Sequence, residues 1–191
     1  MNLFSYFAEG FDLPILDWIA RNLWCPFLDA VMPIITVLGN GGIFWIILAV
    51  VLLLFRKTRR VGVGMGIALL MGLVLCNLTL KPLCHRPRPY DYQLNTFDKL
   101  IPLLIERQHD FSFPSGHTIA SFEAAGVVLL NNKKWGIAAL VLACLIAFSR
   151  LYLYVHYPTD VLVSVVLGFG LAIFGNWLCR RIPDRYLLLN K

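Results

Sequence analysis

Charged side chains are scarce in this chain. They account for 15% of its 191 residues, whereas hydrophobic residues account for 59% and the mean hydropathy is +0.71. Because a soluble domain is about a quarter charged, this composition excludes an ordinary soluble protein and favours one that crosses a membrane repeatedly. The length is that of one domain, so residues 1–191 are expected to form a single unit.

Two kinds of sequence signal are also lacking. The five cysteines show neither the spacing of a disulfide framework nor that of a zinc site, so we interpret them as small apolar side chains. No cleavable signal peptide is recognisable, because Asp12, Asp17 and Arg21 interrupt the early apolar residues. We therefore expect the first membrane span to act as the targeting signal.

Six apolar stretches approach the roughly 20 residues that a bilayer span requires. They lie near 22–39, 42–55, 61–80, 117–132, 135–151 and 158–179. Before them, apolar residues from Phe11 to Ile19 are interrupted by Asp12 and Asp17, which is typical of an amphipathic helix in the membrane interface. The predicted fold is all-α: a polytopic membrane bundle of six transmembrane helices with an N-terminal interfacial amphipathic helix.

The net charge of +6 is compatible with nucleic-acid binding, but the basic residues gather next to the predicted spans. Clusters at 56–60, 133–134 and 180–185 follow the second, fourth and sixth spans, and such basic loops face the cytoplasm. We therefore predict no nucleic-acid partner and a multi-pass protein of the cell membrane (plasma or inner membrane). Both termini are predicted to be cytoplasmic.

Three polar clusters then fall on the opposite, extracytoplasmic side. They are Lys81–Pro89, Pro114–His117 and Ser149–Asp160, in the loops after the third and fifth predicted spans. Segments far apart in the sequence are thus expected to meet at one membrane surface, which predicts a functional site there.

His156 and Asp160 are four residues apart, so on a helix they share a face. The carboxylate would then accept a hydrogen bond from one imidazole nitrogen and leave the other free as a base or nucleophile. The alternative is an interfacial histidine that makes a structural hydrogen bond.

The cluster Pro114–His117 opens the fourth predicted span. Ser115 suits an N-cap, Gly116 allows the backbone to approach a ligand, and the free N–H groups of a helix start attract an anion. His117 is placed to donate a proton to a leaving oxygen. The alternative is an ordinary loop-to-helix cap.

Four basic residues accompany these histidines. Lys81, Arg88 and Arg150 are predicted to bind phosphate, since arginine forks onto phosphate oxygens and lysine adds a point charge. Arg86 is expected instead to anchor the chain at the interface, as basic side chains near headgroups do.

The three clusters together resemble the three-part signature of the type 2 phosphatidic acid phosphatase (PAP2) family. The matching spacings, between residues 81 and 160, are Lys81-x6-Arg88-Pro89, Pro114-Ser115-Gly116-His117 and Ser149-Arg150-x5-His156-x3-Asp160. The resemblance implies a phosphohistidine intermediate, with no metal ion and no other cofactor. It implies that His156 is the nucleophile, that Asp160 orients it and that His117 is the general acid. It assigns the phosphoryl oxygens to the remaining residues, Lys81, Arg88, Ser115, Gly116 and Arg150.

The expected partners are the bilayer and a lipid phosphate or diphosphate. The favoured reaction converts undecaprenyl diphosphate to undecaprenyl phosphate, and phosphatidylglycerophosphate and phosphatidic acid are the alternative substrates. A lipid phosphotransferase and a non-enzymatic lipid-binding or transport protein are alternatives of other classes. The predicted spans argue against a soluble vanadium-dependent haloperoxidase, and the sequence does not specify an oligomeric state.

Other polar features receive more ordinary interpretations. Glu123, inside the fourth predicted span, is expected to be a packing or substrate-channel residue. Gly39–Gly42 is expected to be a tight turn between spans, with an approach to substrate as the alternative. His85 receives no role. Segment 82–113 is predicted to form a substrate-facing lid or a short interfacial helix.

Overall fold

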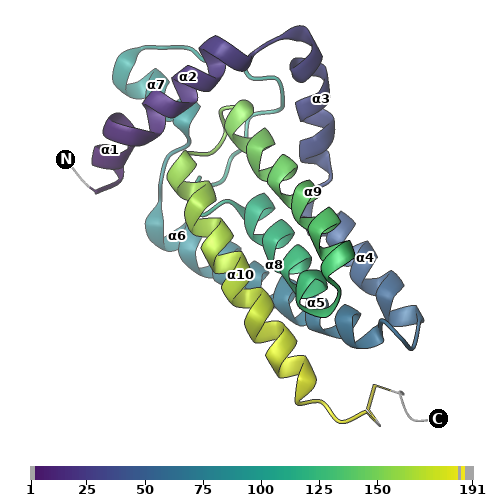
Figure 1. Cartoon of the computed structure of the whole chain (residues 1–191). Helices are drawn as coiled ribbons and strands as arrows, with labels where there is room; N and C mark the ends of the chain where they lie inside the picture. The colour runs from purple at the N-terminus through teal and green to yellow at the C-terminus, as the bar shows by residue number, and fades with distance from the viewer. Residues whose placement is uncertain (1–2, 185, 188–191) are drawn as a thin grey trace.

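Helices account for every regular element in residues 3–184, 186 and 187, which are the residues that this computed structural model describes (Figure 1). For this part of the chain the all-α expectation is confirmed. In chain order the elements are α1 Leu3–Phe7, the π-helix η1 Ala8–Asp12, α2 Leu13–Leu23, α3 Pro26–Val37, the 3-10 helix η2 Asn40–Gly42, α4 Ile43–Leu54, α5 Arg59–Leu73, the π-helix η3 Val74–Leu80, α6 Lys81–Cys84, α7 Pro89–Phe97, α8 Gly116–Asn131, α9 Lys133–Tyr152 and α10 Pro158–Arg180.

α8 is the central helix of the bundle. It packs against α5, α9 and α10, and most of its residues from Thr118 to Val127 are buried. Small side chains allow this close approach, since a Cβ on Gly126 would lie 2.6 Å from the Cβ of Ala172 in α10. A helix enclosed by other helices has no solvent-facing stripe, which accounts for its largely apolar and small residues.

The chain bends, rather than reverses, between α3 and α4. The sequence predicts two separate spans near 22–39 and 42–55, yet the two helices meet at a bend of 41° (Figure 1). Each has 12 residues and is therefore about 18 Å long, too short to cross a hydrocarbon core of about 30 Å alone. The predicted reversal is wrong because Gly41 and Gly42, with φ of 57° and 67°, form a kink and not a hairpin.

Three stretches of the described chain are long and apolar enough to cross a membrane: the run Arg59–Phe97, α9 and α10. The bent pair α3–α4 adds a fourth if the two helices form one span. Six separate spans are therefore not confirmed.

The N-terminal helices lie at the end of the bundle where α9 finishes and α10 begins (Figure 1). The indole N–H of Trp24 donates to the carbonyl of Tyr152 over 3.0 Å, and the hydroxyl of Tyr154 donates to Asp17 over 2.8 Å. Arg180 ends α10 at the far side of the molecule. The N-terminal helices and the end of α10 thus lie at opposite ends of the bundle, because α3 and α4 carry the chain across it once and not twice. The expectation that both termini share one face is not confirmed.

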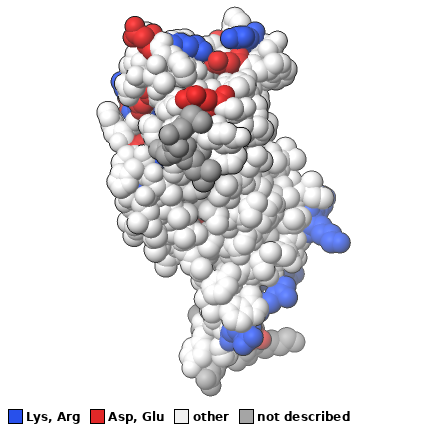
Figure 2. All heavy atoms as spheres, turned by 90° about the vertical axis from the view of Figure 1, so that its left-hand side faces the viewer, with Lys and Arg blue, Asp and Glu red and all other residues white. Residues whose placement is uncertain are grey.

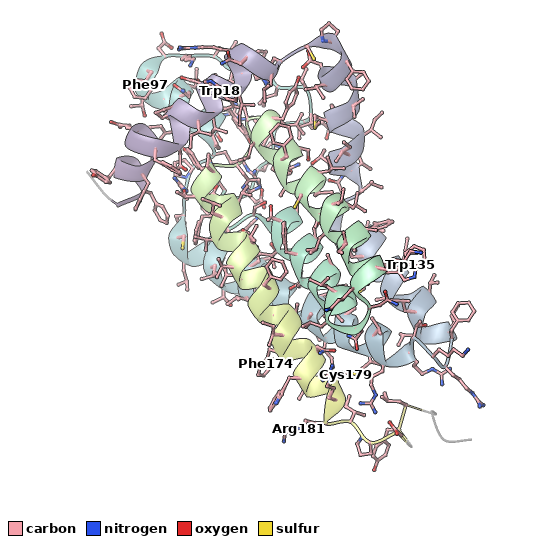
Figure 3. All side chains as sticks on the ribbon, viewed as in Figure 1. Trp18, Phe97, Trp135, Phe174, Cys179 and Arg181 are labelled. Carbon is pink, nitrogen blue, oxygen red and sulfur yellow. The ribbon has the colours of Figure 1, made fainter. Side chains whose placement is uncertain are left out.

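The surface is charged at its two ends and uncharged between them. Figure 2 shows acidic and basic side chains around the N-terminal end, basic ones toward the C-terminal end and a white band between. Trp18 and Phe97 lie at the first end, and Phe174 and Arg181 lie toward the second (Figure 3). Apolar side chains of the band are widely exposed, for example Val166 at 70%. Such a band matches the hydrocarbon core of a bilayer, as expected for a multi-pass membrane protein.

Candidate active site

A cavity of about 480 Å³ brings the three sequence clusters together. It lies where η3, α6, the start of α8, the end of α9 and the loop before α10 converge. Six of the eight predicted site residues line it: Lys81, Arg88, Gly116, His117, Arg150 and His156.

The other two predicted residues lie behind the cavity wall. Ser115 is fully buried at the N-cap of α8, where its backbone N–H donates to Ser164 over 2.8 Å and its hydroxyl accepts from Thr118 over 2.9 Å. Asp160 is also fully buried and lies beside His156. Asp160 can therefore act on a ligand only through another side chain.

His156 lies in the turn that joins α9 to α10. Its Nδ1 is 3.5 Å from a carboxylate oxygen of Asp160, and its Nε2 is 3.3 Å from a guanidinium nitrogen of Arg88. Because a guanidinium only donates hydrogen bonds, this contact requires Nε2 to present its lone pair. The carboxylate then faces the nitrogen that carries the proton, which is the arrangement of an oriented nucleophile.

The electrostatic environment keeps His156 uncharged. Complete burial lowers the pKa of its imidazole well below the usual range, and the positive charges of Arg88, Arg150 and Lys81 lower it further. An unprotonated Nε2 is consequently present at neutral pH without any external base.

Asp160 is held by donors from three directions. The hydroxyl of Ser112 donates to it over 2.6 Å, the backbone N–H of Tyr157 donates over 3.0 Å, and Arg86 forms an ion pair with its other oxygen. The sequence predicts Arg86 to be an interfacial anchor, but its side chain is only 2% exposed. That prediction is wrong because the acidic partners of Arg86, Asp12 and Asp160, are each 74 residues away in the sequence.

Lys81 and Arg88 are bridged by a carboxylate that the motifs do not contain. Both form ion pairs with Asp110, and Arg88 also donates to the carbonyl oxygens of Asp110 and Val155. Burial acts to raise the pKa of Asp110, but Lys81 and Arg88 outweigh it and hold that pKa below the usual range. Asp110 belongs to segment 82–113, of which Arg88, Gln108 and Asp110 line the cavity.

Arg150 uses only part of its N–H donors in hydrogen bonds to the described residues. It is 1% exposed, and one of its nitrogens donates to the hydroxyl of Thr36 over 2.6 Å. Its Nε and the other terminal nitrogen have no hydrogen-bond partner among the described residues. Because buried donors are nearly always satisfied and a buried charge is costly when it is unpaired, these N–H groups indicate a binding site for an anion in the cavity.

The turn between α3 and α4 positions His117. The Nε2 of His117 lies 2.8 Å from the amide oxygen of Asn40, and a Cβ on Gly39 would lie 2.6 Å from its imidazole. Since the oxygen of an amide only accepts hydrogen bonds, Asn40 selects the ring form with a proton on Nε2. The segment Gly39–Gly42 is a turn, and it also lines the cavity, which fits the alternative that it approaches substrate.

The cavity continues into an apolar groove between α4 and α5. Its walls there include Ile46 and Val50 from α4 and Leu70 and Leu73 from α5, side chains that are between 47% and 63% exposed. Exposed apolar side chains within the uncharged band face lipid, so the groove joins the polar cavity to the hydrocarbon region. Glu123 also lines it, and a Cβ on Gly72 would collide with that carboxylate.

Comparisons with known proteins agree with this arrangement. A family model described as the PAP2 superfamily matches residues 59–183. An undecaprenyl-diphosphatase of Sulfolobus acidocaldarius is 31% identical over 160 residues, which cover 83% of this chain and 74% of the relative. The solved structure of LpxE from Aquifex aeolicus is similar with a TM-score of 0.72 and 29% identity, over 86% of this chain and 93% of that one.

A second solved structure extends the likeness over nearly the whole chain. It is a transmembrane PAP2-type phosphatidylglycerolphosphate phosphatase from Bacillus subtilis, with a TM-score of 0.69 and 26% identity over 94% of each chain. The similarity thus extends over the region of the chain that contains the three motifs.

Proposed function

Since this chain belongs to the PAP2 superfamily and is a phosphatase, we propose that it hydrolyses a membrane lipid diphosphate, with undecaprenyl diphosphate as the favoured substrate. The observation that carries the proposal is the free guanidinium edge of Arg150 beside Lys81, Arg88 and an uncharged His156. This anion site opens into an apolar groove, which matches a phosphate carried on a long hydrocarbon tail.

The first chemical step is the attack of His156 Nε2 on phosphorus. A P–N bond forms while the bond from phosphorus to the leaving oxygen breaks. His117 starts as the imidazolium, keeps the Nε2 proton hydrogen-bonded to Asn40 and gives its second ring proton to that oxygen. Lys81, Arg88 and Arg150 stabilise the charge on the equatorial oxygens, and Asp160 balances the positive imidazole through Nδ1–H. Gly116 offers its backbone at the start of α8, and Ser115 supports that helix start.

The second step hydrolyses the phosphohistidine. His117, now a neutral imidazole, takes a proton from water as the water oxygen attacks phosphorus, in accordance with microscopic reversibility. The P–N bond breaks, inorganic phosphate leaves, and His156 recovers its lone pair. His117 is again protonated, so the cycle closes.

We infer five crossings: the bent α3–α4 pair, the run that contains α5, and α8, α9 and α10. At the end of the bundle where α10 finishes, basic side chains outnumber acidic ones and include Arg56, Lys57, Arg59 and Arg60. The positive-inside rule assigns this end to the cytoplasm. The site and the N-terminal helices then face the extracytoplasmic side of the cell membrane, which agrees with the predicted side of the site.

A phosphate-release panel tests the choice of substrate. With purified protein, we expect kcat/KM for undecaprenyl diphosphate to exceed that for phosphatidylglycerophosphate and phosphatidic acid by about tenfold or more, equivalent to about 1.4 kcal/mol. The reason is that a phosphate monoester leaves more readily than an alkoxide. A preference for phosphatidylglycerophosphate would instead assign the activity named for the Bacillus subtilis structure. Transfer of phosphate to another lipid without release would identify a phosphotransferase.

Chelation by EDTA tests whether a metal ion or the cationic side chains stabilise the transferring phosphoryl group. We expect the rate to be largely unchanged after EDTA treatment and dialysis, because three fixed cationic side chains stabilise the transferring phosphoryl group. Readdition of Mg²⁺ or Zn²⁺ is the control. A strong loss that either ion restores would contradict the metal-independent mechanism.

A further inference from the structure

A second buried carboxylate lies behind the nucleophile, contributed by the N-terminal helices. Asp12, the last residue of η1, is fully buried and accepts three hydrogen bonds at the start of α10. They come from the backbone N–H of Thr159 over 2.9 Å, from the Thr159 hydroxyl over 2.8 Å and from Arg86 over 2.6 Å. None of these contacts reaches the cavity, so Asp12 is not placed to touch substrate.

Arg86 divides its guanidinium between two carboxylates. One terminal nitrogen donates to Asp12, and the other donates to Asp160 and to the Thr159 hydroxyl. Its Cζ lies 3.8 Å from the centre of the Tyr157 ring, which keeps the guanidinium in a fixed plane. A guanidinium with only one acid nearby binds both of its oxygens in a fork. The contact with Asp12 prevents this fork from closing on Asp160.

His156 needs a carboxylate oxygen of Asp160 that Arg86 does not bind. With one oxygen of Asp160 on Arg86, the other is left to Ser112, the backbone of Tyr157 and Nδ1 of His156. Closure of the fork would draw this second oxygen toward Arg86 and away from the imidazole. Asp12 also offsets the charge of Arg86, so that the two carboxylates and the guanidinium together carry a net negative charge beside the imidazole that becomes positive during phosphoryl transfer.

We propose that Asp12 is a positioning residue of the catalytic centre, which divides the Arg86 guanidinium between two carboxylates and thereby holds Asp160 against His156. The N-terminal helices are then a working part of the active site and not only a membrane-interface element. The proposal rests on the phosphohistidine mechanism proposed above.

The decisive variant is Asp12→Asn in the full-length protein. We expect kcat for the preferred lipid to fall by about 10- to 100-fold, the range that a displacement of the reacting groups by about 1 Å produces. KM should change little, because the phosphate-holding cations are untouched. Asp12→Glu should recover part of the loss, since it restores the carboxylate.

Asp17→Asn is the matched control. Asp17 also ties the N-terminal helices to the rest of the protein, through Tyr154 and Lys99, but it does not contact Arg86. If Asp12 served only to dock these helices, the two variants would lower kcat and thermal stability alike. Equal effects, or a kcat for Asp12→Asn within twofold of wild type, would overturn the proposal.

Orthovanadate and inorganic phosphate give a readout that does not depend on the lipid. Vanadate adopts the five-coordinate geometry of the phosphoryl-transfer transition state with His156 as an apical ligand, whereas phosphate binds only to the cations. Asp12→Asn should therefore weaken vanadate binding by about 10- to 100-fold and leave phosphate binding unchanged. Equal vanadate affinity in wild type and variant would contradict the positioning role of Asp12. Absence of lipid turnover in wild type would instead count against the proposed function alone.

Discussion

Replacement of His156 by alanine is expected to abolish phosphate release from the preferred lipid. The loss should be about 10⁴-fold or more, since removal of a nucleophile leaves only the catalysis due to binding and charge stabilisation. Wild-type protein quenched during turnover of substrate labelled on the transferred phosphate should carry the label covalently. The variant should carry none, although its cation-lined cavity should still bind inorganic phosphate.

His109→Ala is the matched control for this experiment. His109 is an exposed histidine of the loop before α8 and does not line the cavity, so its loss should leave turnover unchanged. Turnover by His156→Ala within tenfold of wild type would contradict a phosphohistidine intermediate and would favour direct attack by water.

Replacement of His117 by alanine should produce the second largest loss, and its size should depend on the leaving group. For phosphatidic acid the leaving oxygen becomes an alkoxide and needs a proton, so we expect a loss within the range of about 10²- to 10⁴-fold that is typical of a general acid. For undecaprenyl diphosphate the leaving oxygen belongs to a phosphate, which tolerates negative charge. The loss in the first step should there be much smaller.

Single-turnover kinetics on the two lipids measures this difference. Observation of the first step alone matters, because His117 also assists the water that hydrolyses the intermediate. Identical losses for both lipids in the first step would exclude His117 as the general acid and would leave it a structural role with Asn40.

The sequence predicts the convergence of the three motifs because its signals are local. His156 and Asp160 are separated by the four residues that place two side chains on one helical face. The cations Lys81, Arg88 and Arg150 lie at the ends of apolar stretches. The order of the predicted spans is therefore enough to predict that all three lie at the same membrane surface. The cavity contains all of these groups except Asp160, which adjoins it.

The supporting residues could not be predicted in the same way. Asp12, Asn40 and Asp110 fall outside the motifs. Their respective partners Arg86, His117 and Lys81 are 74, 77 and 29 residues away in the sequence. Asp12 in particular looks like the polar face of an amphipathic helix. Only the position of η1 over the start of α10 turns it inward to Arg86.

By itself the sequence determined that this protein is an all-helical membrane phosphatase and which histidines, carboxylate and cations gather at its site. Composition and short-range spacing are sufficient for the membrane class and for the convergence of these groups, whereas the phosphatase activity is implied by the resemblance of the three motifs to the PAP2 family. The tertiary structure decided how the chain crosses the bundle between α3 and α4, and which side chains surround each catalytic group. A glycine turn permits both a hairpin and a kink, so only the packing of α3 and α4 fixed the N-terminal helices on the side of the site. Burial of Arg86 between two distant carboxylates then follows, because a buried charge is stable only where its partners are brought to it.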